Sequence, residues 1–321
     1  MKNETTPSNL FNEVAKEWLH NQKPLLKPSS YVKYYNIINN YLSPELGEIE
    51  ICSITRKRVH NLCRKLLLSG GVRGRSLSPK TVNCAIAVLK NIFTYSLREL
   101  GLSIENISDI SVKQVPHQMR VLSIIEQSNL SNYLCENLTP CNLGILICLY
   151  TGIRIGEICA LKWQDIYFNE NCLHIRKTMQ RIQTLTNSCP KTKLVVLPPK
   201  SISSIRKIPI PFELKRMLMC NRKDPNCYVL TGDTNRFIEP RSLENQFKTV
   251  IQKCKIDQAN FHALRHTFAT RCIELDFDIK SLSEILGHSN VNITLNRYVH
   301  PSMELKQINM NKLSQFLGKK Q

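Results

Sequence analysis

The stretch His262-Ala263-Leu264-Arg265-His266 places two imidazoles and a guanidinium within about one helical turn. Side chains three or four residues apart lie on one face of a helix, so His262 and Arg265 can reach a common ligand. A guanidinium group binds the oxygens of a phosphate through charge-assisted hydrogen bonds. The stretch therefore predicts a helix that carries part of an anion-binding site.

Three further patterns place polar residues where a simple helical domain would not need them. They are Thr151-Gly152-Ile153-Arg154-Ile155-Gly156-Glu157, then Lys200 through Pro209, and then Leu286-Gly287-His288 with Tyr298 ten residues later. Each pattern alone is common, but the four in this order within one basic chain form a specific combination.

Together the four patterns resemble the tyrosine recombinase family, of the phage-integrase type. The helix start Leu77-Ser78-Pro79-Lys80-Thr81-Val82-Asn83 resembles that family as well, so the resemblance covers nearly the whole chain. It implies a fold that is mainly α with a small β-sheet, in which a helical core-binding domain and an α+β catalytic domain form a C-shaped DNA clamp. The first helix is expected near Ser8, so we expect no extra amino-terminal arm-binding domain within this sequence, either because the enzyme is arm-less or because the sequence is truncated. We therefore expect an arm-less or short integrase of a prophage or mobile element.

The resemblance also implies roles for individual residues. Tyr298 is the expected nucleophile, and it needs a proton acceptor and a positive field because a free tyrosine hydroxyl has a pKa of about 10. Arg154 and Arg265 match the family's arginine pair, whose forked donors clamp the non-bridging oxygens of the scissile phosphate. His262 matches the family's acid/base position. We expect the neighbouring His266 to turn toward the interior or to bind a carbonyl group.

Two more residues complete the implied site. His288 follows Gly287, where a helix from about Ile279 is expected to end, and it resembles the family's phosphate-contacting histidine or tryptophan. Glu157 lies one turn after Arg154. It is expected to orient the basic groups of the site, or to be an ordinary acid of a first helical turn.

The general-acid lysine has more than one candidate. The family places this lysine on a β-hairpin before a basic-apolar-proline strand, where it donates a proton to the leaving 5′ oxygen. Lys200 matches the spacing to Pro209, whereas Lys191 and Lys193 resemble it but lie up to nine residues earlier. We expect Lys200 to carry this role.

Positive charge is segregated along the chain. The sequence has 44 Lys+Arg and 25 Asp+Glu, which gives a net charge of +19, and the segments 51–98 and 171–210 hold no acidic residue. Acid-free blocks of this length indicate a surface that faces phosphates, and a solubilising face is the alternative. The expected DNA contacts are Arg56, Lys57, Arg58, Arg73, Arg75, Lys80, Lys177 and Arg206.

Apolar periodicity predicts two domains. We expect a helical core-binding (SAM-like) DNA-binding domain at residues 1–106, a linker at 107–121, and a catalytic integrase domain with a C-terminal helix at 122–321. The pair Ser78-Pro79 predicts the N-cap and first turn of a long helix that reaches about Glu99.

The second domain is expected to combine helices with a small sheet. Strand-like runs are predicted at 172–178, around 194–197, at 205–210 and at 228–231, so the second acid-free block falls on a hairpin or small sheet.

Composition and spacing exclude several classes of protein. The 13 cysteines are scattered without a CxxC cluster, so neither a zinc site nor a disulfide framework is expected. His262 and His266 stand at zinc-ligand spacing, but Ala263 occupies the position where a HExxH enzyme has glutamate. No apolar segment has the length of a signal region or a membrane span. We expect a cytoplasmic protein without a membrane partner, a cofactor or a metal.

The predicted function is site-specific DNA recombination, the integration or excision of a mobile element, through a 3′-phosphotyrosyl intermediate at Tyr298. Two arginines, a lysine and histidines can supply the charge that a metal would give, and the bond energy retained in the ester makes ATP unnecessary. The expected partners are double-stranded DNA, other copies of the chain in a homotetrameric synapse, and an accessory directionality factor. The alternatives are a type IB topoisomerase, a resolvase and a catalytically silent DNA-binding relative.

Overall fold

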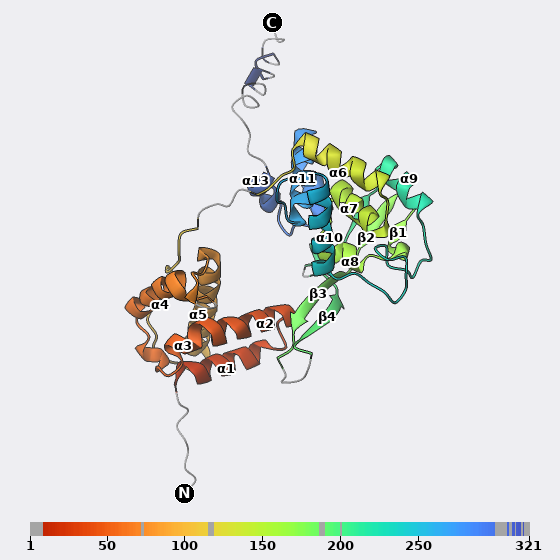
Figure 1. The fold of residues 1–321 in the computed structure, drawn as a ribbon. Coiled ribbons are helices and arrows are strands. Elements are labelled where there is room, and N and C mark those ends of the chain that lie inside the picture. Colours follow the sequence, from red (N-terminus) through yellow and green to blue (C-terminus); the bar gives the residue numbers. More distant parts are fainter. Residues whose placement is uncertain are drawn as a thin grey trace. The chain divides into compact units, whose positions relative to one another are not determined.

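The computed structural model describes residues 9–71, 74–114, 119–185, 190–199 and 201–298, together with positions 307, 310, 311, 313–315 and 317. The chain divides into two compact units (Figure 1). One unit contains residues 1–117 and 182–193, and the other contains 118–181 and 194–321. Helices predominate and the strands are few and short, which confirms the predicted fold class of mainly α structure with small sheets.

The first unit is a bundle of helices. Its elements are α1 (Phe11–Gln22), α2 (Pro28–Ile37), a π-helical turn (Ile38–Leu42), α3 (Ser43–Leu46), α4 (Arg56–Ser69) and α5 (Pro79–Glu99). The apolar side chains of these helices face one core, in which Trp18 stacks on Tyr34 with ring centroids 5.7 Å apart. As predicted, Ser78 caps α5: its hydroxyl accepts a hydrogen bond from the Thr81 backbone N–H, and Pro79 occupies the first turn.

Half of the predicted linker packs on this first unit. Ile107 and Ile110 are buried in its core, and the side-chain amide of Asn83 exchanges two hydrogen bonds of 2.8 Å with the backbone of Val112. The Lys90 ammonium donates to the carbonyls of Ser108 and Ile110. Two apolar residues three apart in a polar stretch give too short a period to reveal this packing from sequence.

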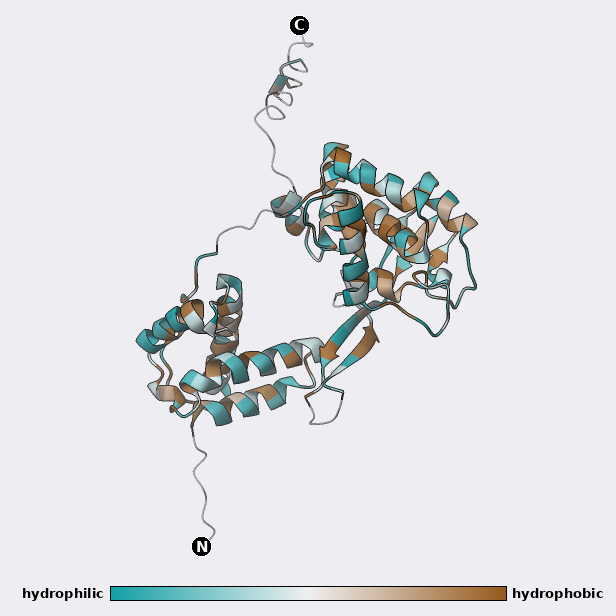
Figure 2. Ribbon diagram, viewed as in Figure 1, coloured by the Kyte–Doolittle hydropathy of each residue, from teal (hydrophilic) through white to brown (hydrophobic). Residues whose placement is uncertain are grey.

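The second unit is built around α7. Its helices are α6 (Ile124–Glu136), α7 (Pro140–Thr151), α8 (Ile155–Ala160), α9 (Phe212–Cys220), α10 (Pro240–Lys253), α11 (His262–Glu274), α12 (Ile279–Leu286) and α13 (Val291–Tyr298). Residues 142–149 of α7 are all buried, and much of this helix is brown in Figure 2. A helix that is apolar all round belongs in a core, where neighbours cover every face. Helices α6, α8, α9 and α11 pack against it.

Two small sheets accompany these helices. Strands β1 (Ile166–Tyr167), β2 (Cys172–Ile175) and β5 (Arg206–Pro209) form an antiparallel sheet in the order β1-β2-β5. Strands β3 (Thr178–Gln183) and β4 (Thr192–Leu197) pair as a hairpin, whose end at 182–193 groups with the first unit. The run predicted as one strand at 172–178 is therefore two strands.

The strand predicted at 228–231 is wrong. Tyr228 makes only an isolated bridge with Lys162. The backbone N–H of Tyr228 donates to Asp233 and its carbonyl accepts from Gly232, so a local turn takes the groups that a sheet would need. In the part of the chain that the structure describes, no helix has the length and apolar content to span a bilayer.

Candidate active site

Arg154 stands where α7 gives way to α8. Gly152 ends α7 with a left-handed φ of 65°, and Arg154 is the N-cap of α8. Its backbone N–H donates to one carboxylate oxygen of Glu157 (2.9 Å) and its guanidinium to the other (2.8 Å). The same guanidinium also donates to the carbonyl of Gly287 (3.2 Å). The sequence neighbour Glu157 therefore aims Arg154 at the end of α12.

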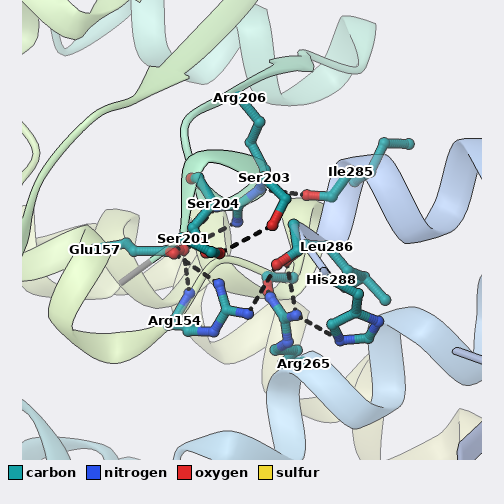
Figure 3. Close-up of polar contacts among 12 residues, drawn as sticks. Arg154, Glu157, Ser201, Ser203, Ser204, Arg206, Arg265, Ile285, Leu286 and His288 are labelled. Atoms are coloured by element: carbon teal, nitrogen blue, oxygen red, sulfur yellow. Dashed lines mark hydrogen bonds and ion pairs between the residues drawn. The ribbon is translucent and has the colours of Figure 1, made fainter. Parts of the chain in front are cut away.

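Arg265 projects from α11 into the interior and is 2% exposed. Its Nη1 donates to the carbonyl of Gly152 (2.9 Å), and its Nη2 lies 2.7 Å from the carbonyl of Leu286 and 2.9 Å from Nε2 of His288 (Figure 3). Burial, reinforced by the nearby cations Arg154 and Arg206, lowers the pKa of Arg265 to about 9. Arg265 thus remains a cation at neutral pH.

His288 follows α12 as predicted, since Gly287 ends that helix with a left-handed φ of 65°. Its Nε2 faces Arg265, which can only donate, so Nε2 accepts and the ring proton sits on Nδ1. Nδ1 then donates to the Thr294 hydroxyl of α13 (2.8 Å). The hydrogen bonds at its two nitrogens fix the orientation of this imidazole next to both arginines.

Tyr298 lies at the end of α13 and is 8% exposed. Its hydroxyl is 3.0 Å from Nδ1 of His266, and its ring runs parallel to that of His288 with centroids 6.4 Å apart. Its ring belongs to an apolar cluster that includes Leu282 and Leu286 of α12. The expected nucleophile thus lies beside the imidazole and guanidinium groups that the sequence assigned to the same site.

His266 is a functional candidate that the sequence reasoning missed. It is buried, which agrees with the expected turn toward the interior, and its Nδ1 lies 3.0 Å from the Tyr298 hydroxyl. His262 is exposed, and its ring meets that of His266 edge to face with centroids 4.5 Å apart. The spacing of His262 and His266 predicts that they touch. The approach of α13 to α11 is a tertiary contact that no local pattern encodes.

Arg206 was expected to contact DNA, and the structure places it in the interior. Its side chain is 5% exposed, and its two terminal nitrogens donate to the two carboxylate oxygens of Glu157 (3.0 and 2.9 Å). Its Nε donates to the carbonyl of Ile285. The burial of Arg206 could have been predicted from the alternation of side chains along a strand. Arg206 and Ile208 are two residues apart on β5 and share a face, and Ile208 is a core residue.

Glu157 is the acid that ties these arginines together. Burial alone would raise the pKa of its carboxyl, but the hydrogen bonds and charges of Arg206 and Arg154 outweigh burial and the pKa lies below its ordinary value. Glu157 is therefore a carboxylate at neutral pH. Its position favours the expected orienting role over that of an ordinary first-turn acid.

The loop that leads into β5 borders the site. The Ser201 hydroxyl lies 2.9 Å from the hydroxyls of both Ser203 and Ser204 (Figure 3). The Ser203 carbonyl lies 3.1 Å from the position that a Cβ of residue 287 would take. The expected general acid Lys200, directly before Ser201, lies outside the described residues. The alternative candidates Lys191 and Lys193 are exposed at the end of the β3–β4 hairpin, in the segment that groups with the first unit.

The remaining expected DNA contacts are mostly exposed. Arg56 is held by Asp109, with two hydrogen bonds of 2.7 Å, and by the carbonyl of Asn106. Its acidic partner follows the acid-free block in the sequence, which is why the block alone did not predict the pair. Arg73 lies outside the described residues. Exposed side chains are those of Lys57, Arg58, Arg75, Lys80 and Lys177.

One group of metal-ligating side chains lies elsewhere in the described part of the second unit. Ligand atoms of Glu170, Cys172 and His174 are within 4.8 Å of one another. Arg176 donates to Nδ1 of His174 (2.6 Å), so Nε2 keeps the proton and offers no lone pair. Lys207 lies 2.7 Å from Glu170 and holds the pKa of that carboxyl below its ordinary value. Two cations beside this group favour an ion-pair cluster over a metal site.

The arrangement defines an anion-binding site beside a tyrosine hydroxyl. A family model described as the phage integrase family matches residues 121–304, and one described as the N-terminal SAM-like domain of phage integrases matches residues 10–67. The first match covers more than half of the chain. The chain therefore belongs to the phage integrase family, which confirms the resemblance to tyrosine recombinases.

Relatives with curated names agree with this family. A XerC-like tyrosine recombinase of Caldanaerobacter subterraneus subsp. tengcongensis is 28% identical over 298 residues, which cover 85% of this chain and 74% of the relative. The tyrosine recombinase XerD of Rickettsia bellii is 22% identical and covers 87% of this chain and 90% of its own.

Solved structures share the fold. The integrase of transposon Tn1549, in complex with a circular intermediate DNA, superposes with a TM-score of 0.74 at 21% identity, and the match covers 94% of this chain and 99% of the other. A lambda integrase tetramer bound to a Holliday junction gives a TM-score of 0.62 at 15% identity, over 88% and 77% of the two chains. At these identities the likeness shows the fold alone.

Proposed function

We propose that Tyr298 is the nucleophile with which this tyrosine recombinase cleaves and rejoins DNA at specific sites, through a 3′-phosphotyrosyl intermediate and without a metal or ATP. The observation that carries the proposal is the state of Arg265. None of the ion pairs among the described residues involves Arg265, although this side chain is almost fully buried and still cationic. A buried charge that lacks an ion pair costs several kcal/mol, and the charge of Glu157, which favours the cation, does not outweigh the effects of burial, Arg154 and Arg206. An incoming phosphate would supply a counter-ion.

The site would stabilise the charge that develops on the phosphate. Arg154 and Arg265 provide forked donors from two elements, and His288 would add a third donor beside them when the phosphate replaces its Nε2 as the acceptor of Arg265 and Nε2 takes up a proton. These groups are held before DNA arrives by backbone carbonyls and by Glu157. A preorganised set of donors lowers the barrier because little reorganisation is needed during the reaction.

The proposed reaction joins the nucleophile Tyr298 to phosphorus and releases the 5′ oxygen as the leaving group. The Tyr298 oxygen attacks phosphorus, the bond to the 5′ oxygen breaks, and a general acid protonates that oxygen, a role we assign to Lys200 from its spacing to Pro209. The 5′ hydroxyl of a partner strand reverses the step. His262, exposed next to His266, keeps its proposed part in acid/base transfer.

We further propose that the substrate is the double-stranded DNA of a mobile element, bound by a homotetramer in the synapse with an accessory directionality factor, and that the protein acts in the cytoplasm. The exposed side chains of Lys57, Arg58, Arg75, Lys80 and Lys177 would bind the phosphates of the duplex. The lambda integrase tetramer on a Holliday junction supports the assembly by analogy. The topoisomerase and resolvase alternatives are not favoured, because the matched relatives are recombinases.

A selection for covalent adducts tests the proposal and identifies the cleaved DNA sequence in the same experiment. The protein is incubated in EDTA with nicked duplexes that carry a randomised central segment, and DNA that stays protein-linked after denaturation is recovered and amplified. Enrichment of one duplex by the wild type and not by Tyr298→Phe is the expected result. If no duplex is enriched, or if Tyr298→Phe enriches the same one, Tyr298 is not the nucleophile.

A further inference from the structure

We propose that His266 holds the Tyr298 hydroxyl before the reaction and accepts its proton when Tyr298 attacks the phosphate. This inference rests on the function proposed above. It adds to that function a proton acceptor at a position that neither the motif nor the resemblance marked as catalytic.

The contact between the two side chains carries the inference. Nδ1 of His266 lies 3.0 Å from the Tyr298 oxygen, a normal distance for a hydrogen bond between a phenol and an imidazole. Both residues are buried, at 6% and 8% exposure, so little water competes for this bond. A general base must lie within hydrogen-bond reach of the proton that it removes, and His266 meets that requirement.

One buried cation, Arg265, stands among the charged and titratable groups around this contact. On α11, on α7 and α12, which pack against it, and at His288 just after α12, the groups of this kind whose side chains the structure describes are His262, Arg265, Arg271, Cys272, Glu274, Cys141, Cys148, Tyr150, Lys280, Glu284 and His288. Burial raises the pKa of Cys272 to about 12 and that of Cys148 further, so both thiols are neutral. Lys280 and Glu284 are exposed. Arg265 is the buried cation of the set, and its charge interacts with Tyr298.

His262 connects His266 with solvent. The rings of the two histidines meet at 4.5 Å, and His262 is exposed while His266 is not. A proton taken from Tyr298 into the interior can therefore leave by way of His262. This arrangement preserves the acid/base role expected for His262 and gives the buried histidine the contact with the nucleophile.

The proposed step balances. The Tyr298 O–H bond breaks, its electron pair forms the bond to phosphorus, and the proton moves to Nδ1 of His266. The bond between phosphorus and the 5′ oxygen breaks, and that oxygen takes a proton from the general acid. In the rejoining step the 5′ hydroxyl attacks the phosphorus of the phosphotyrosine and returns its proton to the group that acted as general acid. The bond between phosphorus and the Tyr298 oxygen breaks, and that oxygen regains its proton from His266.

The test compares His266→Asn with the wild type on the selected nicked duplex, with the rate of covalent adduct formation measured across the pH range. The Asn carboxamide oxygen can accept the Tyr298 hydrogen bond near the Nδ1 position, but it cannot take the proton. We expect Asn to slow adduct formation roughly 100- to 10,000-fold at neutral pH. We also expect the remaining rate to rise about tenfold per pH unit, following the tyrosinate fraction.

The matched control is His174→Asn, which replaces a buried histidine outside the site and should leave the rate and its pH profile unchanged. Thermal melting and non-covalent DNA binding check that each variant folds. If His266→Asn does not fold, His266→Ala is assayed with added imidazole, which should restore the rate in proportion to its concentration.

The outcomes separate the two proposals. A His266→Asn protein that keeps the wild-type rate and pH profile overturns the role of His266 as proton acceptor, and so does a folded His266→Ala protein that imidazole does not rescue. A wild-type protein that forms no Tyr298-linked adduct overturns the proposed function itself, and this inference with it.

Discussion

Glu157 and Arg206 form a two-pronged ion pair in the interior of the second unit, with nitrogen–oxygen distances of 3.0 and 2.9 Å and side-chain exposures of 2% and 5%. The same carboxylate also binds Arg154. One buried acid therefore fixes two cations, one of which faces the proposed phosphate position.

Replacement of Glu157 by glutamine should destabilise the protein strongly. The amide keeps the size of the side chain but leaves two arginines without their counter-ion, and breaking a buried pair in this way costs about 3–5 kcal/mol. Equilibrium unfolding in urea measures the change. The matched control is Glu213→Gln, which removes an exposed pair with Arg216 and should cost no more than about 1 kcal/mol. Equal decreases in the free energy of unfolding of the two variants would show that the buried ion pair stabilises the protein no more than the exposed one.

The stability difference between wild type and Glu157→Gln should depend on pH. The pKa of Glu157 is lowered in the folded protein, so the carboxylate contributes stability that is fully present above its ordinary pKa of 4.5. That contribution is lost as the pH falls through the folded pKa. Unfolding curves should therefore show a constant difference from neutral pH down to about 4.5 and a shrinking one below. A difference that grows on acidification would contradict the assigned charge state.

Arg265→Lys should abolish most of the chemistry and spare DNA binding. A lysine cannot reproduce the forked contacts with Gly152 and Leu286 or present two donors to a phosphate. We expect adduct formation to fall roughly 100- to 1,000-fold, as for the loss of one oxyanion donor. Arg271→Lys, on the same helix but outside the site, serves as the control and should react at the wild-type rate. Binding of the selected duplex in a gel-shift assay should be similar in all three proteins.

Local features of the fold could be predicted from sequence because short-range rules encode them. Ser78 and Pro79 predict the start of α5, and Gly287 predicts the end of α12, after which His288 follows. The arginines Arg154 and Arg265 lie together as their motifs implied. These signals depend on neighbours within one or two helical turns.

Other features depend on tertiary contacts and escaped prediction. Arg206 and Glu157 are 49 positions apart, and only the tertiary contact between a side chain of β5 and one of α8 turns a basic residue of an acid-free block into a buried partner. His266 and Tyr298 meet because α13 packs against α11. A pattern in one segment carries no information on which polar group another segment will bring to it. For Arg206, the alternation of side chains along β5 could have predicted its burial, because Ile208 on the same face is apolar. No such pattern was available for His266.

Gly287→Ala should lower the free energy of unfolding by more than the backbone strain of a left-handed residue alone. Gly101→Ala is the control that measures this strain by itself. Both glycines have a left-handed φ, of 65° and 63°, so an alanine at either position costs about 1 kcal/mol from the backbone alone. At residue 101 a Cβ meets no atom within 4 Å, whereas at residue 287 it would lie 2.9 Å from Cδ of Arg206 and 3.1 Å from the Ser203 carbonyl. We expect unfolding in urea to show an extra loss of about 1–3 kcal/mol for Gly287→Ala. Adduct formation should fall in this variant alone, because the displaced backbone carries His288 and the carbonyl that Arg154 binds. Equal stability and equal rates in the two variants would mean that the contact between Arg206 and the end of α12 does not hold the site.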